Sequence, residues 1–303
     1  MSKISVILAT FNEEKNIKEC LESVKWADEI VIVDGTSNDK TVEIAKKYTK
    51  KIIVKDNPLM FHINKQLAIE KTTGDWILYI DADERVTPEL KQEFLTVMQD
   101  NEINGYWIPR KNIIFGKWIE HTGWSPDYQL RFFRNGKGKL PCKSVHEQPV
   151  VEGNTRKLIN PLIHYNYNSV NQFLNKLINI YTENDKKVKI ERGEKIESSS
   201  AIRFPVDEFL KRFYLEAGYK DGLHGLVLSM FQSFSSFVTF AKIWEEQDFP
   251  EFNPKDFLNL KEVEFKNIAK AFNYWFLTVK INNTNNILLK NFYRLKRKLL
   301  SFL

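Results

Sequence analysis

The sequence predicts an α/β fold in its first half, a mostly parallel sheet with helices on both faces, followed by a C-terminal helical region. Two patterns lead to this prediction. Up to about residue 90, short apolar runs rich in β-branched residues alternate with segments whose apolar positions recur at helical spacing. Beyond about Tyr167 only helical patterns remain. We therefore expect one domain over residues 1–167 and a helical region over residues 168–303.

Four buried strands and the helices between them account for the first half. The expected strands are the apolar runs at residues 3–9, 29–33, 51–54 and 76–80. Behind Asn12, the expected cap of the first helix, apolar residues recur at helical spacing: Ile17, Cys20, Leu21 and Val24. Further helices are expected over residues 39–48 and 63–70. This alternation predicts ligand binding at the carboxyl ends of the strands.

Polar residues collect where three of these strands end. The first strand runs into "TFNE", the second into "DGTSND" and the fourth into "DADE", which places Asp81, Asp83 and Glu84 within four residues. Like charges this close repel one another unless a cation lies among them. An Asp-x-Asp is often only a turn before a helix, here the one expected from Thr87 and Pro88. Its position beside two other polar loops favours a Mg²⁺ or Mn²⁺ site instead.

Missing motifs, net charge and cysteine positions exclude some classes of protein and favour others. No G-x-G-x-x-G or G-x-x-x-x-G-K-[ST] segment is present, so a dinucleotide cradle and a P-loop are both excluded. The net charge of +6 suits an anionic partner without choosing among nucleic acid, phospholipid and a phosphorylated substrate. Cys20 and Cys142 lie far apart, and the apolar run near the amino terminus is shorter than a signal peptide requires. We expect a cytoplasmic protein with reduced thiols.

Several motifs resemble a known family. The segments "ISVILATFNEE", "VIVDGTSNDKTVEIA" and "GDWILYIDADE" resemble the family-two inverting glycosyltransferases, whose GT-A fold is Rossmann-like. The later segments "GWSPDYQLRFFRN", "VHEQPV" and "LIHYNY" resemble the branch that adds glucose or a related sugar to the lipopolysaccharide inner core. The resemblance implies a nucleotide-diphosphate sugar as donor, usually a UDP-sugar, and a divalent cation, Mg²⁺ or Mn²⁺. It implies a cell-envelope glycolipid or polysaccharide as acceptor.

The resemblance also implies which residues bind the nucleotide. The residues that match family positions around the base, the ribose and the nucleotide are Thr10, Phe11, Glu13, Asp34, Lys65 and Asp81. Phe11 stands where the family often has tyrosine, so a hydroxyl is lost. Gly35 stands where a second acid is frequent, which removes one nucleotide contact. A solvated lysine on a helix is the alternative for Lys65.

The metal and the catalytic base come from the same motifs and the segment after them. Asp83, with Asp81, is expected to hold the metal that bridges the two phosphates, and His164 is either a third ligand or a structural histidine. An inverting transfer needs a carboxylate that deprotonates the acceptor hydroxyl. Glu147 is the preferred candidate, with His146 beside it. Asp127 is the second, in an aromatic setting expected to raise its pKa.

Two basic residues and two C-terminal segments complete the predictions. Arg131 and Arg134 either meet a phosphate or are strand-edge charges. Residues 222–241 carry no formal charge and have the length of a membrane span, but their polar side chains favour a buried or interfacial helix. The last helix carries one apolar face and a basic remainder. The apolar residues are Leu288, Phe292, Leu295, Leu299 and Phe302. Such a helix either docks on an anionic membrane, at the inner face of the cytoplasmic membrane, or packs on the domain.

Three other classes remain as alternatives. A nucleotidyltransferase also binds nucleotide and metal on an α/β sheet, but its glycine-rich, lysine-bearing first loop is missing from "ATFNEEKN". A nucleic-acid binder should line one face with basic and aromatic residues, whereas the basic residues gather in the C-terminal tail. A non-catalytic, nucleotide-sugar-binding membrane scaffold would tolerate loss of the metal acids, and both are present.

Overall fold

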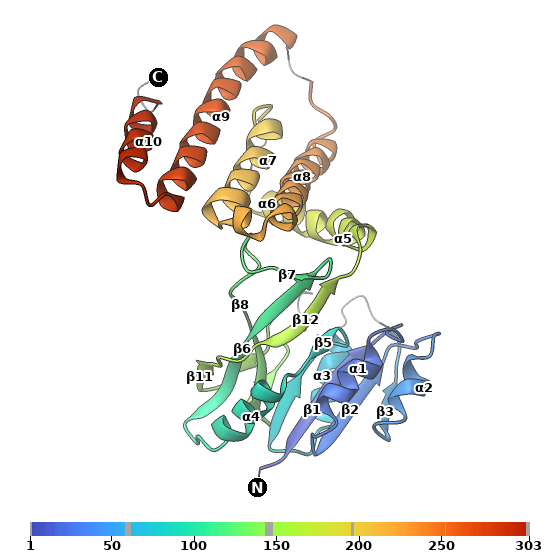
Figure 1. Ribbon diagram of the computed structural model, residues 1–303. Coiled ribbons are helices and arrows are strands. Elements are labelled where there is room, and N and C mark those ends of the chain that lie inside the picture. Colours follow the sequence, from blue (N-terminus) through green and yellow to red (C-terminus); the bar gives the residue numbers. More distant parts are fainter. Residues whose placement is uncertain (1, 58–61, 143–147, 195–196, 252, 301–303) are drawn as a thin grey trace. The chain divides into compact units, whose positions relative to one another are not determined.

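The computed structural model describes residues 2–57, 62–142, 148–194, 197–251 and 253–300 (Figure 1). The chain divides into two compact units. The first, here called the sheet unit, consists of Met1–Ile114 and Ser125–Asn166, and the second, the helical unit, of Phe115–Trp124 and Tyr167–Leu303. The boundary between the two units falls at Asn166 and Tyr167, and the earlier segment Phe115–Trp124 belongs to the helical unit.

The sheet unit contains one large mixed sheet in the order β3-β2-β1-β4-β8-β6-β12-β5, with β11 beside β6. Its first four strands are parallel to one another, as predicted, and β8 and β6 continue the sheet in antiparallel fashion. The strands are β1 (Ile4–Thr10), β2 (Glu29–Asp34), β3 (Lys51–Val54), β4 (Trp76–Tyr79), β5 (Glu84–Arg85), β6 (Ile103–Ile114), β8 (Asp127–Arg134), β11 (Asn154–Lys157) and β12 (Leu162–Tyr167). The strands β9 (Gly138–Lys139) and β10 (Val150–Val151) form a separate pair.

Helices cover both faces of this sheet, which confirms the predicted layering. They are α1 (Ile17–Val24), α2 (Thr41–Ala45), α3 (His62–Glu70) and α4 (Pro88–Val97). One core lies under α1 and α4, where Phe94 meets Phe132 with ring centroids 4.5 Å apart and Trp76 stacks on Phe132 at 4.7 Å. A smaller core on the opposite face buries Ala68 and Ile69 of α3. The buried apolar strands therefore order the sheet, and their carboxyl ends stay at one edge.

The first helix differs from its prediction at its beginning. Asn12 does not cap α1, because the helix begins only at Ile17 and Asn12 adopts a left-handed conformation with φ 54°. The Asn12 side chain instead accepts a hydrogen bond from the backbone N–H of Asn38, 3.0 Å away, and so joins the first polar loop to the second. The next helix, α2, is shorter than predicted, and the Asp39 carboxylate accepts from the N–H of Thr41 at its start.

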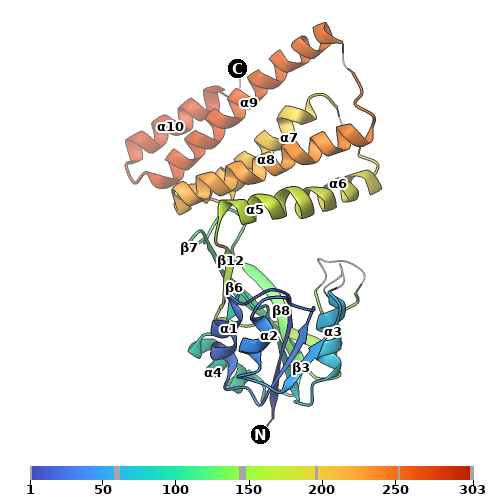
Figure 2. The same cartoon turned by 90° about the vertical axis from the view of Figure 1, so that its right-hand side faces the viewer.

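The helical unit is built from stacked helices (Figure 2). They are α5 (Val170–Lys176), a π-helical turn (Leu177–Tyr181), α6 (Thr182–Glu191), α7 (Ser200–Leu210), a second π-helical turn (Lys211–Leu215), a 3₁₀ turn (Gly218–Asp221), α8 (Leu223–Glu246), α9 (Pro254–Asn283) and α10 (Ile287–Leu300). The short strand β7 (Lys117–Trp118) also belongs here. In the described chain, α8 alone has the length and mean hydropathy (1.3) of a membrane span, a test that buried helices also pass. Because α8 packs against α6 and α7, we regard it as part of the helical unit.

Candidate functional site

The polar loops predicted to meet at the carboxyl edge of the sheet do meet there. Thr10 and Asp34 are register partners on β1 and β2, and the Thr10 hydroxyl donates to Oδ2 of Asp34 over 2.9 Å. Asp34 is fully buried, and its two oxygens also accept from the N–H and hydroxyl of Ser37. Phe11 is exposed at the same edge. Asp34 thus fixes the loop after β2 beside an open aromatic ring.

Glu13, the next predicted nucleotide residue, lies where the first loop enters α1. Its backbone N–H donates to the Thr41 hydroxyl over 2.7 Å, and its carboxylate accepts from the side chain of Asn16 at 2.8 Å. Its carbonyl accepts from the N–H groups of Asn16 and Ile17. These contacts hold the first loop against the start of α2.

Asp81 is held by two buried cations. Nζ of Lys65 lies 2.7 Å from one carboxylate oxygen, and Nη2 of Arg131 lies 2.8 Å from the other. Both cations adjoin Tyr79, with the Arg131 guanidinium 3.9 Å from the ring centroid. Burial alone would raise the pKa of Asp81, but Lys65 and Arg131 outweigh it and hold that pKa well below its usual range. Lys65 is therefore a buried partner of Asp81 and not a solvated surface lysine.

Glu84, the third acid of the crowded segment, is also neutralised inside the protein. Its side chain is fully buried, and one oxygen accepts from the backbone N–H of Asp81 at 2.8 Å. The other oxygen lies 3.4 Å from Arg131 and 3.5 Å from Arg110. Two of the three clustered acids thus have protein cations as partners, which removes most of their mutual repulsion.

Asp83 differs from its two neighbours. Among the residues that the structure describes, its ionisable partner is His164, whose Nε2 lies 3.5 Å from Oδ2. His164 pairs in register with Glu84 through β12 and β5, which brings it to Asp83 from far along the chain. The Asp81 and Asp83 side chains are 29% and 26% exposed, whereas that of Glu84 is 0% exposed. A ligand can therefore reach Asp81 and Asp83, and of these two Asp83 is the one with no lysine or arginine partner among the described residues.

Asn112 connects this pair to Asp127 and was not foreseen from the sequence. Its amide nitrogen donates to Oδ2 of Asp127 over 2.9 Å, and its oxygen lies 2.7 Å from Nδ1 of His164. With the amide oriented this way, the proton of a neutral His164 is on Nδ1, and the Nε2 lone pair is directed to Asp83. Asn112 is fully buried. A polar residue before the apolar pair Ile113-Ile114 on β6 was its only signal in the sequence.

Asp83 and His164 fit a divalent cation better than Asp81 does. A carboxylate oxygen and an imidazole nitrogen that is oriented from behind by an amide form a usual pair of ligands for Mn²⁺. Both oxygens of Asp81 are already in ion pairs. The described residues contain no group of three or more His, Cys, Asp or Glu side chains suited to a metal. A cation at Asp83 would therefore need oxygens from a ligand, such as phosphate oxygens, to complete its coordination.

Of the two candidate bases, Asp127 lies within the described residues and Glu147 does not. Asp127 pairs with Arg110 across β8 and β6, at 2.8 Å, and also accepts from Gln129 at 2.7 Å. Burial would raise the pKa of Asp127, but Arg110 and the two amides lower it below its usual range. The expectation of a raised pKa is therefore wrong, because an arginine stands opposite Asp127 in the register. Glu147, with His146, lies outside the described residues.

Arg134 does not share the site of Arg131. It stacks on Trp76, with its guanidinium 4.6 Å from the ring centroid, and donates to the backbone carbonyls of Asp100 and Ile103. Trp76 is its register partner at the amino end of β4, away from Asp81. Of the two expectations for this residue, a strand-edge structural role matches these contacts.

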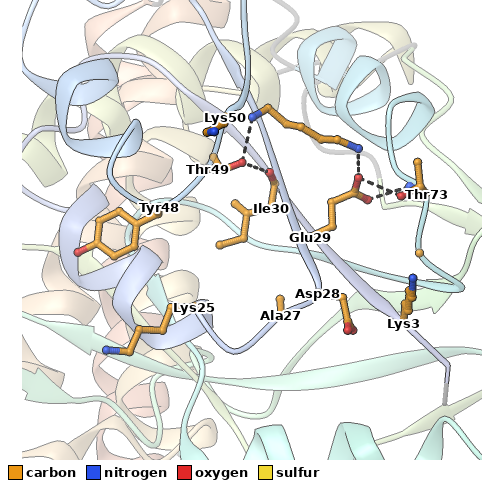
Figure 3. A pocket seen from close by; sticks show the side chains of 12 residues that line it. Lys3, Lys25, Ala27, Asp28, Glu29, Ile30, Tyr48, Thr49, Lys50 and Thr73 are labelled. Atoms are coloured by element: carbon orange, nitrogen blue, oxygen red, sulfur yellow. Dashed lines mark hydrogen bonds and ion pairs between the residues drawn. The ribbon is translucent and has the colours of Figure 1, made fainter.

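A second group of charges lies at the amino ends of the strands, around a hollow of about 550 Å³ (Figure 3). Glu29, the first residue of β2, accepts from the N–H of Thr73 at 2.8 Å and from the side chains of Ser5 and Lys51. Burial would raise the pKa of Glu29, but these donors lower it to about 2. Glu29 is thus bonded to β1, to β3 and to Thr73 before β4, so its role at this edge is structural.

Comparison with known proteins shows which protein family and which individual proteins this chain is similar to. The sequence profile of the family described as "Glycosyl transferase family 2" matches residues 5–151. An uncharacterized glycosyltransferase of Rickettsia typhi is 30% identical over 263 residues, covering 81% of this chain and 88% of the relative. A lipopolysaccharide core biosynthesis glycosyltransferase of Rhizobium meliloti is 28% identical, covering 80% and 92%. The crystal structure of S. aureus TarS 1-349 aligns with a TM-score of 0.42 and 15% identity over 79% of this chain and 91% of that one.

Proposed function

Since this chain belongs to glycosyl transferase family 2, we propose that it transfers a hexose such as glucose, with inversion, from a nucleoside-diphosphate sugar to a cell-envelope acceptor. The observation that supports the proposal is the way the acids at the carboxyl edge are bonded. Asp34 is hydrogen-bonded inside the fold, both oxygens of Asp81 are in ion pairs, and Asp83 faces His164. The similarity to the Rhizobium meliloti enzyme supports a lipopolysaccharide core acceptor.

The donor nucleotide, which we take to be UDP, binds along the first two loops in this proposal. Phe11 offers an exposed ring on which a base can stack, and Thr10 and Asp34 form the hydrogen-bonded floor beside it. Glu13 orders the loop through Thr41. Lys65 acts through Asp81, because its ammonium is buried against that carboxylate. Asp81, held ionised, then accepts from a ribose hydroxyl.

Asp83 and His164 would hold a divalent cation, Mg²⁺ or Mn²⁺, beside the diphosphate. When bound, the cation would supply positive charge that stabilises the leaving diphosphate, so that no general acid would be required. The protein's own residues contribute by positioning the side chains of this site. Asn112 orients the His164 ring, and Lys65 and Arg131 hold both oxygens of Asp81 in ion pairs.

The acceptor hydroxyl loses its proton to a carboxylate as its oxygen attacks the anomeric carbon opposite the diphosphate. We assign this base to Glu147 on its place in the sequence. Asp127 is the weaker candidate, since its ion pair with Arg110 lowers its proton affinity. Asp127 instead orders Asn112, and through Asn112 the imidazole of His164.

A cytoplasmic enzyme with a glycolipid acceptor works at the inner face of the cytoplasmic membrane, and we propose a peripheral contact there. The alternatives are a non-catalytic nucleotide-sugar-binding scaffold and a nucleotidyltransferase. The presence of Asp83 beside His164 favours a catalyst over a scaffold. The missing glycine-rich, lysine-bearing first loop argues against nucleotidyl transfer.

The donor can be identified without an acceptor. Purified protein with Mn²⁺ should slowly hydrolyse one member of a panel of nucleotide sugars and release its nucleoside diphosphate. We expect release from a UDP-hexose, which chelator abolishes. Release of pyrophosphate from a nucleoside triphosphate would support the nucleotidyltransferase instead. Binding of a UDP-sugar without turnover, even with a core oligosaccharide present, would support the scaffold.

A further inference from the structure

The C-terminal helix α10 lies against α9 with its polar side, so its apolar side is left uncovered. Nη1 of Arg297 donates to the Thr278 hydroxyl over 2.9 Å, and its guanidinium lies 5.1 Å from the Tyr274 ring centroid. Nζ of Lys280 lies 5.3 Å from the ring centroid of Tyr293. Figures 1 and 2 both show α10 alongside α9. The two alternatives raised by the sequence, docking or packing, are therefore compatible, because different faces of the helix are involved.

The uncovered side of α10 is a continuous apolar stripe. Leu288, Phe292, Leu295 and Leu299 recur every three or four residues, so they share one side of the helix. Each is between 58% and 82% exposed. A soluble protein rarely leaves so many large apolar side chains in water on one helix without a partner for them. We call these four residues the α10 stripe.

Positive charge surrounds the α10 stripe. The helix contains five basic residues and no acidic one: Lys290, Arg294, Lys296, Arg297 and Lys298. Lys296 and Lys298 are exposed, and their helical positions fall on opposite sides of the stripe. A second copy of the chain would bring this basic surface against itself, and like charges would repel. An anionic phospholipid surface satisfies both the apolar stripe and its basic rim.

We propose that α10 lies in the interface of an anionic phospholipid membrane, with the α10 stripe among the acyl chains and Lys296 and Lys298 among the headgroups. Arg297 and Tyr293 keep the helix attached to α9, so docking requires no release of α10 from the helical unit. The inference rests on the proposed function only in giving the membrane a purpose, access to a glycolipid acceptor.

Vesicle co-sedimentation of the full-length protein tests the proposal. The probes are vesicles of phosphatidylcholine alone and of phosphatidylcholine with roughly a quarter phosphatidylglycerol. Wild type should bind the anionic vesicles, and the double variant Phe292→Ser/Leu295→Ser should lose most of that binding. Lys296→Gln and Lys298→Gln should each weaken binding roughly fivefold, the change that corresponds to about 1 kcal/mol per basic residue. Raising salt from about 0.1 M to about 1 M should weaken binding as well.

A matched control lies on α9. Val263 and Phe265 are each 58% exposed, like Phe292 at 58% and Leu295 at 59%, but they lie about 20 Å along α9 from Thr278, where α10 is held. The variant Val263→Ser/Phe265→Ser should bind vesicles like wild type. Equal loss in both double variants would overturn the assignment to α10. Equal binding to neutral vesicles, or a dimer that Phe292→Ser/Leu295→Ser dissolves, would overturn the anionic membrane as partner.

Turnover separates this inference from the proposed function. Hydrolysis of the donor sugar, or transfer to a small soluble acceptor, should be the same in Phe292→Ser/Leu295→Ser as in wild type. Vesicle binding without any turnover would leave the docking surface intact and refute the transferase. Turnover without α10-dependent vesicle binding would do the reverse.

Discussion

The two ends of the central sheet both collect charged side chains but satisfy them in different ways. At the amino ends, Glu29 accepts from four donors on neighbouring strands and loops, so its carboxylate is fully used by the fold. At the carboxyl ends, Asp81 is similarly locked by Lys65 and Arg131, yet Asp83 next to it meets only a histidine among the described cationic side chains. A charge cluster therefore indicates function where an accessible carboxylate has no lysine or arginine partner in the described structure.

The largest effect is expected when Asp83 is removed. Asp83→Ala should abolish transfer and Mn²⁺-dependent donor hydrolysis, because the cation loses its carboxylate. The melting temperature should change little, since no described ion pair of the core is lost. Calorimetry of Mn²⁺ binding with UDP present, and thermal unfolding, measure the two effects. Activity close to that of wild type in the presence of chelator would refute the metal site.

The catalytic base gives the next largest effect. Glu147→Gln should lower kcat by about 10²–10⁴-fold while donor binding persists, as expected for a lost general base. Asp127→Asn should have a much smaller effect on kcat, because Asp127 acts on His164 only through Asn112. Steady-state kinetics with a core oligosaccharide acceptor distinguishes the two. The opposite ranking would transfer the role of base to Asp127.

Arg131 tests whether locking Asp81 matters for the reaction. Arg131→Gln should reduce kcat/KM by about 10–100-fold, mainly through the KM for the donor. The pKa of Asp81 is held low by Lys65 and Arg131 against the effect of burial, so removing Arg131 raises it and moves the acid limb of the pH–rate profile to higher pH. Arg131→Lys should restore part of the activity.

Arg134, three residues along the same strand, supplies the control for Arg131. Arg134→Gln loses its stacking on Trp76 and its bonds to two carbonyls, so it should lower stability but not the kinetics of the folded enzyme. An unchanged pH–rate profile in Arg131→Gln would reduce Arg131 to the same structural role.

The smallest effect is expected at the amino edge, and it concerns stability alone. Glu29→Gln should lower the free energy of unfolding by about 1–3 kcal/mol, because hydrogen bonds to a charged acceptor are weakened, with kcat/KM unchanged. The pKa of Glu29 is lowered to about 2 in the fold from an ordinary value of 4.5, so its ionised form stabilises the protein fully above pH 4.5. The difference in melting temperature between Glu29→Gln and wild type should therefore shrink as the pH falls toward 2. A loss of activity in folded Glu29→Gln would show that the two edges are coupled.

The layers of the sheet unit, and the sheet edge at which the candidate site lies, could be predicted from local sequence patterns. Strand and helix periodicity is local, and the apolar runs at β1, β2 and β4 end in polar loops whatever the rest of the chain does. The motif around Asp81 and Asp83 likewise lies in one contiguous stretch, which is why the family resemblance was visible. The beginning of α1 was wrongly predicted at Asn12, because the Asn12 side chain bonds to the second loop and the helix begins at Ile17.

Which charged side chains are paired with one another depends on the tertiary structure. His164 reaches Asp83 through the pairing of β12 with β5, and Asn112 reaches Asp127 through β6 and β8, in registers that no local pattern encodes. The pKa of Asp127 was misjudged for this reason, since Arg110 lies 17 residues earlier in the chain. In α10 both faces could be read from the sequence, but the contacts with α9 determine that the polar face is the covered one. Local propensity depends on neighbours in the chain, whereas pairing of charges depends on neighbours in space.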